Sequence, residues 1–185
     1  PEPPERMADR ITWAGLRGLE LDPSLVPPLM ATNPAVAEAC LALLAFTRQK
    51  PEATRAGVEA AYMPDQTPSV LSLANLLSQR LGLGPADRFR SLLSHPDLTV
   101  AFTAAAALAR AGDAGDVARI EAACEARCAD LTNAPAGQAI RDTGYHHWYA
   151  GKAARAPAAR YFFGIAREAL LLRTEPIVIP PSTPV

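Results

Sequence analysis

The sequence predicts an all-α protein of about four helical hairpins, followed by a C-terminal helical cap and an extended proline-rich tail. Two observations lead to this prediction. One helix-start pattern recurs, and the segments after it carry apolar residues at helical spacing. Alternating runs that would indicate strands are absent, apart from 177–179. The recurring pattern stands at Asp22-Pro23-Ser24-Leu25, Asn33-Pro34-Ala35-Val36, Thr67-Pro68-Ser69-Val70 and His95-Pro96-Asp97-Leu98.

This pattern is typical of helix starts because its first two residues each suit a first helical turn. Side-chain oxygens of Asp, Asn and Thr accept hydrogen bonds from the free N–H groups of that turn. Proline at the first helical position loses no bond, and its φ angle is preset. Recurrence of one helix-start device therefore indicates a protein built from repeated helical units.

The expected helices follow in order, each with its own start, apolar stripe or stop signal. They are about 7–19, with Ile11, Ala14 and Leu19 as a partial stripe; 21–30, opened by Asp22-Pro23; 34–47, with Val36, Cys40 and Leu43; 52–62, its partner after Pro51; 68–81, with Val70, Leu73 and Leu77, ended by Gly82; 85–93, a short partner; 96–111, opened by His95-Pro96, with Leu98, Ala101, Phe102 and Leu108; 117–131, with Val117, Ile120, Cys124 and Cys128 on one face; 134–142; and 157–173, with Phe162, Ile165, Ala169 and Leu172 as the buried face.

A gapless comparison relates two of these units. A shift of 62 positions places Asn33 on His95 and Pro34 on Pro96, and it keeps aliphatic residues aligned through both helices of the unit. The other aligned pairs are Val36 with Leu98, Ala39 with Ala101, Phe46 with Leu108, Arg48 with Arg110, Val58 with Ile120 and Glu59 with Glu121.

The segment from His95-Pro96-Asp97-Leu98 through Ala109-Arg110-Ala111-Gly112-Asp113 to Ile120 resembles the short bacterial HEAT repeat, with a proline-started helix, small residues, a Gly-Asp turn and a second aliphatic helix. The resemblance covers about residues 8–131 and lacks the Asp-Val-Arg pattern common in such helices. The resemblance implies a right-handed α-α superhelix, that is, a solenoid with an extended binding surface. The expected organisation is a proline-rich linker at 1–7, HEAT-like repeats at 8–131, a helical cap at 132–173 and an extended proline-rich tail at 174–185.

The region after the repeats holds the aromatic and basic residues that are the candidate partner-binding site. From Arg127 onward basic residues exceed acidic ones by three, whereas the rest of the chain carries a net charge of −4. The alternative interpretation is a capping element, in which large aromatics replace a missing neighbouring repeat. The candidate residues are Tyr145, His146, His147, Trp148, Tyr149, Lys152, Arg155 and Arg160.

Signatures of catalysis, cofactor binding and metal binding are not found, so no catalytic, cofactor or metal residues are expected. The chain has no phosphate-binding glycine loop, nucleophile elbow or His-Glu-x-x-His motif. Adjacent His146 and His147 would project about 100° apart on a helix, which disfavours one shared ion. Three cysteines do not form a disulfide framework and favour reduced thiols.

The sequence therefore favours a non-catalytic scaffold or assembly module whose partner is a protein or a neighbouring domain. Such a module is compatible with a fragment of a larger bacterial protein. A nucleic-acid-binding solenoid, such as a DNA alkylation-repair glycosylase-like protein, is the alternative, with Trp148 and Asp142 as the pair to test. A third hypothesis is that the tail docks into a groove. We expect no membrane span and a cytoplasmic location, with an exported mature form or a fragment left open.

Overall fold

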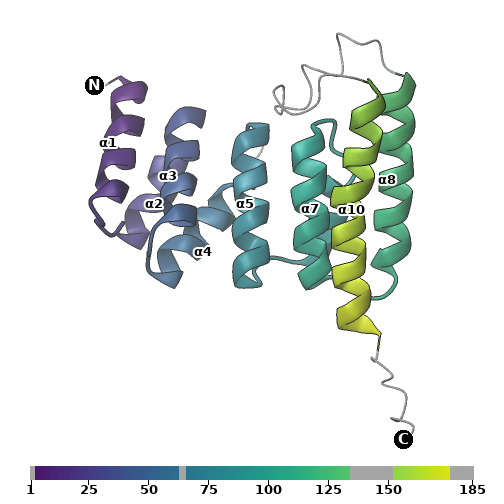
Figure 1. Cartoon of the computed structure of the whole chain (residues 1–185). Coiled ribbons are helices and arrows are strands. Elements are labelled where there is room, and N and C mark those ends of the chain that lie inside the picture. The colour runs from purple at the N-terminus through teal and green to yellow at the C-terminus, as the bar shows by residue number, and fades with distance from the viewer. Residues whose placement is uncertain (1–2, 63–65, 134–151, 176–185) are drawn as a thin grey trace, which may run out of the picture.

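The computed structural model describes residues 3–62, 66–133 and 152–175, and every regular element in these ranges is helical (Figure 1). The all-α prediction is confirmed. No helix in the described ranges is long and apolar enough to cross a membrane. The elements in chain order are α1 (Pro4–Leu16), the 3-10 helix η1 (Pro23–Leu25), α2 (Val26–Met30), α3 (Pro34–Phe46), α4 (Pro51–Ala60), α5 (Pro68–Leu81), α6 (Ala86–Leu92), α7 (Leu98–Ala111), α8 (Asp116–Asn133) and α10 (Lys152–Thr174).

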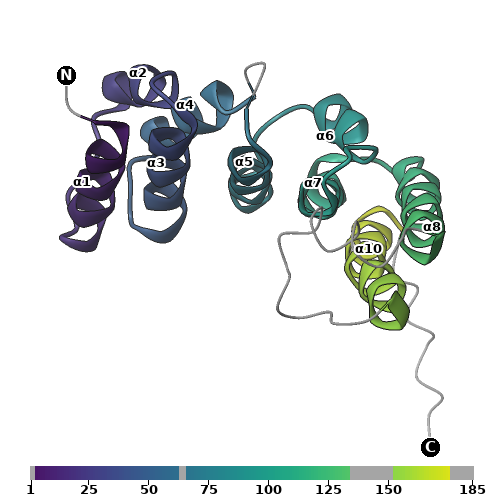
Figure 2. The ribbon, with the colours of Figure 1, turned by 90° about the horizontal axis from the view of Figure 1, so that it is seen from above.

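The helices form two layers. In the first layer α1, α3, α5, α7 and α10 lie side by side, each in contact with the next (Figure 1). The helices α2, α4, α6 and α8 form the second layer, so the chain alternates between layers (Figure 2). The first layer turns at α7 toward α10, which leaves the outer face of α7 recessed between α5 and α10 (Figure 2).

Three first-layer helices begin with the same N-cap geometry. The side-chain oxygens of Asn33, Thr67 and Asp97 each accept a hydrogen bond from the backbone N–H of a valine three residues later, at 3.1, 3.4 and 3.1 Å. The helix starts expected at Asn33-Pro34 and Thr67-Pro68 are confirmed.

Two predicted helix starts differ from the structure. The start assigned to His95-Pro96 is wrong by two residues: α7 begins at Leu98, because Asp97 caps it and the N–H of Asp97 donates to His95 Nδ1 at 3.0 Å in the preceding turn. The first helix begins at Pro4, inside the expected linker, and ends before Gly18, whose φ of 72° is left-handed.

Aligning the three capping residues reveals a repeated buried face. Thr67 lies 34 residues after Asn33, and Asp97 lies 30 residues after Thr67, so the structural register between the first and third units is 64 rather than 62. In this register five positions are buried in all three helices. They are Val36, Val70 and Val100; Cys40, Ala74 and Ala104; Leu41, Asn75 and Ala105; Leu43, Leu77 and Ala107; and Leu44, Ser78 and Leu108.

The helix α10 continues the first layer beyond α7. Its buried residues are Ala159, Phe163, Ala166 and Leu170, which face α7 and α8. The stripe predicted to be buried, Phe162, Ile165, Ala169 and Leu172, is wrong, because all four residues are exposed. The stripe one residue further along the helix, which contains Phe163 and Ala166, packs against α7 and α8 instead. Its small residues let α10 approach these two helices closely.

A buried amide joins α5 to α7 and to the end of α4. The Nδ2 group of Asn75 donates to Thr103 Oγ1 at 3.1 Å and to the carbonyl oxygen of Val100 at 3.3 Å. Its Oδ1 accepts from the hydroxyl of Tyr62 at 2.7 Å. All of its polar atoms are thereby paired within a fully buried site, which fixes the two helices in one register.

A second buried polar group joins α6 to the turn before α8. The carboxylate of Asp116 is buried and accepts from Arg90 at 2.7 and 2.8 Å, from Arg119 at 2.9 Å and from the backbone N–H of Asp113 at 2.9 Å. Arg90 also pairs with Asp87 and Asp113. The hydrogen bonds from Arg90 lower the pKa of Asp116 from 3.8 to about 2.

The substitution Asn75→Ala is expected to lower the free energy of unfolding by about 2–3 kcal/mol, because it leaves the Tyr62 hydroxyl and the Val100 carbonyl without their buried partner. Urea unfolding measures the change. The matched control is Ser72→Ala on the same helix: the Ser72 hydroxyl is buried without a hydrogen-bond partner in the described ranges, so its removal should be neutral or stabilising. Equal losses from both substitutions would contradict the network.

The wild-type chain is expected to lose about 2 kcal/mol of stability through Asp116 as the pH falls from about 4 to about 2. The sign follows from the lowered pKa: the folded state holds the carboxylate ionised, so protonation favours unfolding. Asp116→Asn should be less stable than wild type at pH 6, with the difference shrinking toward zero at pH 2. Thermal unfolding against pH checks this, and a pH-independent difference would refute it.

Candidate functional site: a groove over α7

Most of the candidate binding residues expected from the sequence lie where the structure gives no account of them. Tyr145, His146, His147, Trp148 and Tyr149 fall outside the described residues, as does Asp142. Lys152 and Arg155 belong to the first turns of α10, of which the backbone alone is described. Arg160 is exposed on the same helix. The site expected from the sequence therefore stays a prediction.

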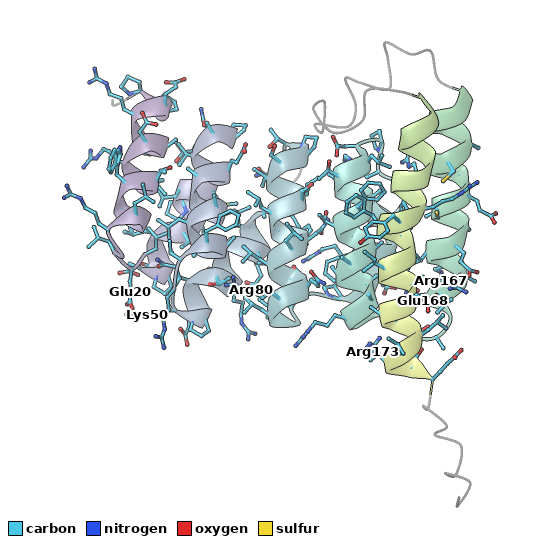
Figure 3. All side chains as sticks on the ribbon, in the orientation of Figure 1. Glu20, Lys50, Arg80, Arg167, Glu168 and Arg173 are labelled. Carbon is cyan, nitrogen blue, oxygen red and sulfur yellow. The ribbon has the colours of Figure 1, made fainter. Side chains whose placement is uncertain are left out.

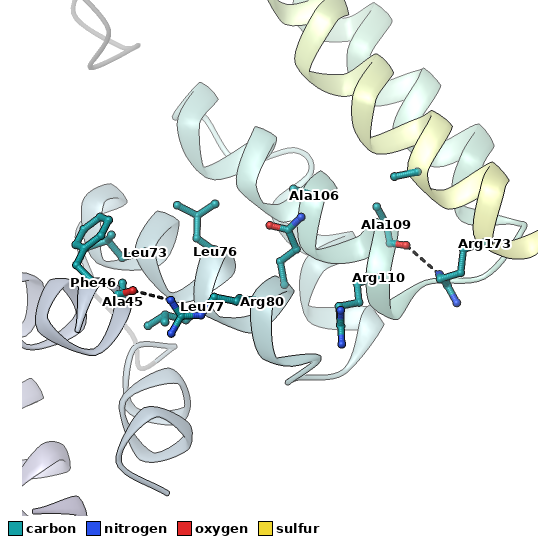
Figure 4. Close-up of a pocket in the computed structure, with 12 residues that line it drawn as sticks. Ala45, Phe46, Leu73, Leu76, Leu77, Arg80, Ala106, Ala109, Arg110 and Arg173 are labelled. Carbon is teal, nitrogen blue, oxygen red and sulfur yellow. Dashed lines mark hydrogen bonds between the residues drawn. The ribbon is translucent and has the colours of Figure 1, made fainter. Parts of the chain in front are cut away.

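A different surface, which we name the α7 groove, is hollowed into the first layer (Figure 4). It joins cavities of about 680 and 240 Å³, which share Leu76, Gln79, Ala106, Ala109 and Ala169. Residues of α5 form one wall and residues of α10 form the other. The floor is α7, where Ala106 and Ala109 present only methyl groups. Small residues on the middle helix and larger ones on its neighbours thus produce the hollow.

The walls of the groove are apolar and exposed. Leu76 on α5 is 43% exposed, while Phe162 and Ile165 on α10 are 40% and 52% exposed. At one end the Phe102 ring lies 5.1 Å from Phe162, measured between ring centroids, and makes a T-shaped contact with Phe163 at the same distance. Contiguous apolar surface of this kind is the usual mark of an interaction site in a folded chain.

Three arginines, which we name the arginine row, stand at the opposite end: Arg80, Arg110 and Arg173. Arg80 donates to the carbonyl oxygen of Ala45 at 2.7 Å, and Arg173 donates through Nε to that of Ala109 at 3.0 Å and through Nη2 to that of Gly112 (Figures 3 and 4). Both therefore bridge to the C-terminal end of the preceding first-layer helix, where the helix dipole favours a cation.

Arg110 differs from the other two arginines. It lies beside Gly82, which has a φ of 67°; a Cβ at Gly82 would stand 3.0 Å from Arg110 Nε. Within the described ranges no hydrogen bond or ion pair is formed by its guanidinium. The ion pairs found there lie elsewhere, as in Lys50 with Glu20 and Arg167 with Glu121, and none includes a member of the arginine row. The three arginines of the row therefore carry positive charge that no carboxylate pairs with in the described part of the chain.

The groove is lined by apolar side chains for most of its length and by cations at one end. Its described lining residues are apolar side chains, a glutamine, two threonines and the arginine row, with no carboxylate, imidazole or thiol among them. The thiols lie elsewhere, and burial raises the pKa of Cys40 to about 12 and that of Cys124 to about 11. Across the described ranges no three His, Cys, Asp or Glu side chains are grouped to hold a metal ion.

Sequence reasoning missed this groove, although part of its signal is present in the chain. Arg80 and Arg110 each lie 13 residues after the capping residue of their helix, Thr67 and Asp97. Alignment on the capping residues places Arg80 on Arg110, whereas the alignment on His95 places Arg48 on Arg110 instead. Comparisons of the chain with models of protein families, with curated proteins and with solved structures give no match.

Substitutions in the arginine row are expected to differ in their effect on stability, because Arg173 has hydrogen-bond partners in the described structure and Arg110 has none. Arg173→Met should lower the free energy of unfolding by about 1 kcal/mol, because it removes donations to two helix-end carbonyls. Arg110→Met should change it by less than about 0.5 kcal/mol, since no partner is lost in the described structure. Chemical denaturation of both variants measures this. A larger loss from Arg110→Met would assign that residue a structural role.

Proposed function

We propose that this chain is a non-catalytic protein-binding module, a HEAT-like right-handed superhelix that holds a segment of a partner protein or of a neighbouring domain in the α7 groove. The alternation of the chain between two layers and the five recurring buried positions support the repeat architecture. Stacked units of this kind present one extended surface, and the groove lies on such a surface.

The observation that carries the proposal is the exposed apolar stripe of α10 facing the wall of α5 across α7. The solvent-facing side of a helix at the end of a layer is normally polar, because nothing in the same chain covers it. Here α10 instead directs Phe162 and Ile165 into the groove, opposite Leu76. Burial of such side chains against a partner would contribute roughly 25 cal/mol per Å² of apolar area, which is the main source of affinity in protein interfaces.

Nucleic-acid binding is the second candidate, and the arginine row favours it. Three guanidinium groups along successive helix ends could contact phosphates. The surface between them is aliphatic, however, and nucleic-acid sites normally carry a denser set of cations. The two functions predict opposite salt responses: phosphate binding weakens steeply with salt, whereas apolar burial does not.

Filling the groove is expected to remove partner binding without unfolding the chain. Ala106→Trp places an indole on the groove floor, and Ala118→Trp places one on the exposed face of α8 in the second layer. Tagged wild type and both variants would be used for affinity purification from the native organism, followed by quantitative mass spectrometry. Proteins captured by wild type and Ala118→Trp should be lost with Ala106→Trp.

The same three proteins, together with Arg110→Glu, would then be titrated with a 20-base-pair DNA duplex at 50 and 200 mM salt. Circular dichroism melting confirms that the variants are folded. Equal capture by Ala106→Trp and wild type would contradict binding in the α7 groove. Duplex affinity that is salt-sensitive and lost in Arg110→Glu would favour the nucleic-acid function instead.

A further inference from the structure

We infer that the segment bound in the α7 groove is a short amphipathic α-helix whose carboxylates lie toward one end, against the arginine row. The inference rests on the proposed function, which states only that the groove binds protein. It adds the secondary structure, the length and the charge pattern of the bound segment, each of which follows from a separate feature of the groove.

The shape of the groove fits a helix. Its floor is a helix with Ala106 and Ala109 uppermost, and its walls are the ridges of two further helices in the same layer. Small side chains at a contact allow two helix axes to approach to about 8–10 Å. A helix laid over α7 would have Leu76 on one side and Ile165 on the other, the helix-in-groove mode of peptide recognition.

An extended peptide has less to bind to. Strand addition needs the free edge of a sheet, and the described ranges contain helices without any strand. Along the groove the backbone N–H and C=O groups are already paired within α5, α7 and α10, apart from the helix ends. A helix satisfies its own backbone, so it can enter an apolar groove without leaving buried polar groups unpaired.

The length of the bound helix follows from the floor. The groove extends along α7 from Thr99 to Arg110. At 1.5 Å per residue this distance is about 16 Å, or roughly three turns of helix. Apolar residues at positions i, i+3, i+4 and i+7 of a segment of about 12 residues would span it.

The two ends of the groove require different chemistry. Contacts between Phe102 and Phe162, and between Arg173 and the carbonyl of Ala109, show that α7 and α10 run in the same direction. The aromatic end and the arginine end are therefore separated along the whole groove. Arg110 has all five guanidinium donors available in the described structure, a geometry that suits bidentate pairing with a carboxylate. Acidic residues belong at this end of the bound helix.

A library of random 16-residue peptides displayed on phage tests the inference directly. The full chain is the bait, and peptides that also bind Ala106→Trp are removed by counter-selection. The surviving peptides should combine helical apolar spacing with at least two acidic residues in one terminal turn. Synthetic peptides are then titrated by fluorescence anisotropy, and circular dichroism should show that they gain helicity on binding.

Charge exchange tests the contact with the arginine row. Arg110→Glu should weaken the best peptide by about 10-fold or more, whereas Arg55→Glu, at an exposed arginine on α4, should change its affinity by less than about twofold. Replacing the acidic residues of the peptide with glutamine should cause a similar loss. A peptide carrying lysines at those positions should recover affinity for Arg110→Glu.

Failure of this inference is distinct from failure of the proposed function. Peptides that depend on Ala106 but are proline-rich, or that lack acidic residues and bind Arg110→Glu as well as wild type, would overturn the acidic helix while keeping the groove as a protein-binding site. If no peptide survives the counter-selection against Ala106→Trp, or if duplex DNA is the ligand that Arg110→Glu loses, the proposed function and this inference are both wrong.

Discussion

The structure depends on the lateral packing of the first-layer helices against one another. The helix α7 contacts α5 and α10 more extensively than α8, the helix that follows it in the chain. Five buried positions recur in α3, α5 and α7, and they mix valine and leucine with alanine, cysteine, serine and asparagine. Small residues at these positions let neighbouring helices approach closely, so α3, α5 and α7 each bury one face against the helices beside them in the layer.

A few polar residues are buried within this core, and their hydrogen bonds determine the register of one helix against the next. Asn75 occupies the position held by Leu41 in α3 and Ala105 in α7, yet all its polar atoms are paired. A shift of α7 along α5 would break those bonds inside a buried site, which costs more than sliding one apolar face over another. Asp116 similarly ties the turn before α8 to Arg90 on α6. Apolar packing therefore stabilises the fold, whereas Asn75 and Asp116 fix the relative positions of the helices that they join.

Local chemistry explains what could be predicted from the sequence. Caps such as Asn33 and Thr67 act within one turn, so their helix starts were correctly placed. At 95–98 two capping candidates stand two residues apart, and the choice of His95 over Asp97 shifted the repeat register. The buried stripe of α10 could not be read from periodicity, because adjacent stripes carry Phe162 and Phe163 and only tertiary contact decides between them. The groove was missed because residues of four helices, α3, α5, α7 and α10, come together to line it.

The helix ends give the groove its polarity. Backbone carbonyls at the ends of α3 and α7 accept from Arg80 and Arg173, which draws guanidinium groups to the same end of the layer. A carboxylate arriving there competes with these carbonyls for donors already in use. At Arg110 it meets no such competition within the described structure, and the left-handed glycine beside it leaves room for the guanidinium. The capping of helix ends, which is a structural requirement, therefore engages Arg80 and Arg173 and leaves Arg110 available to the acidic helix that we propose.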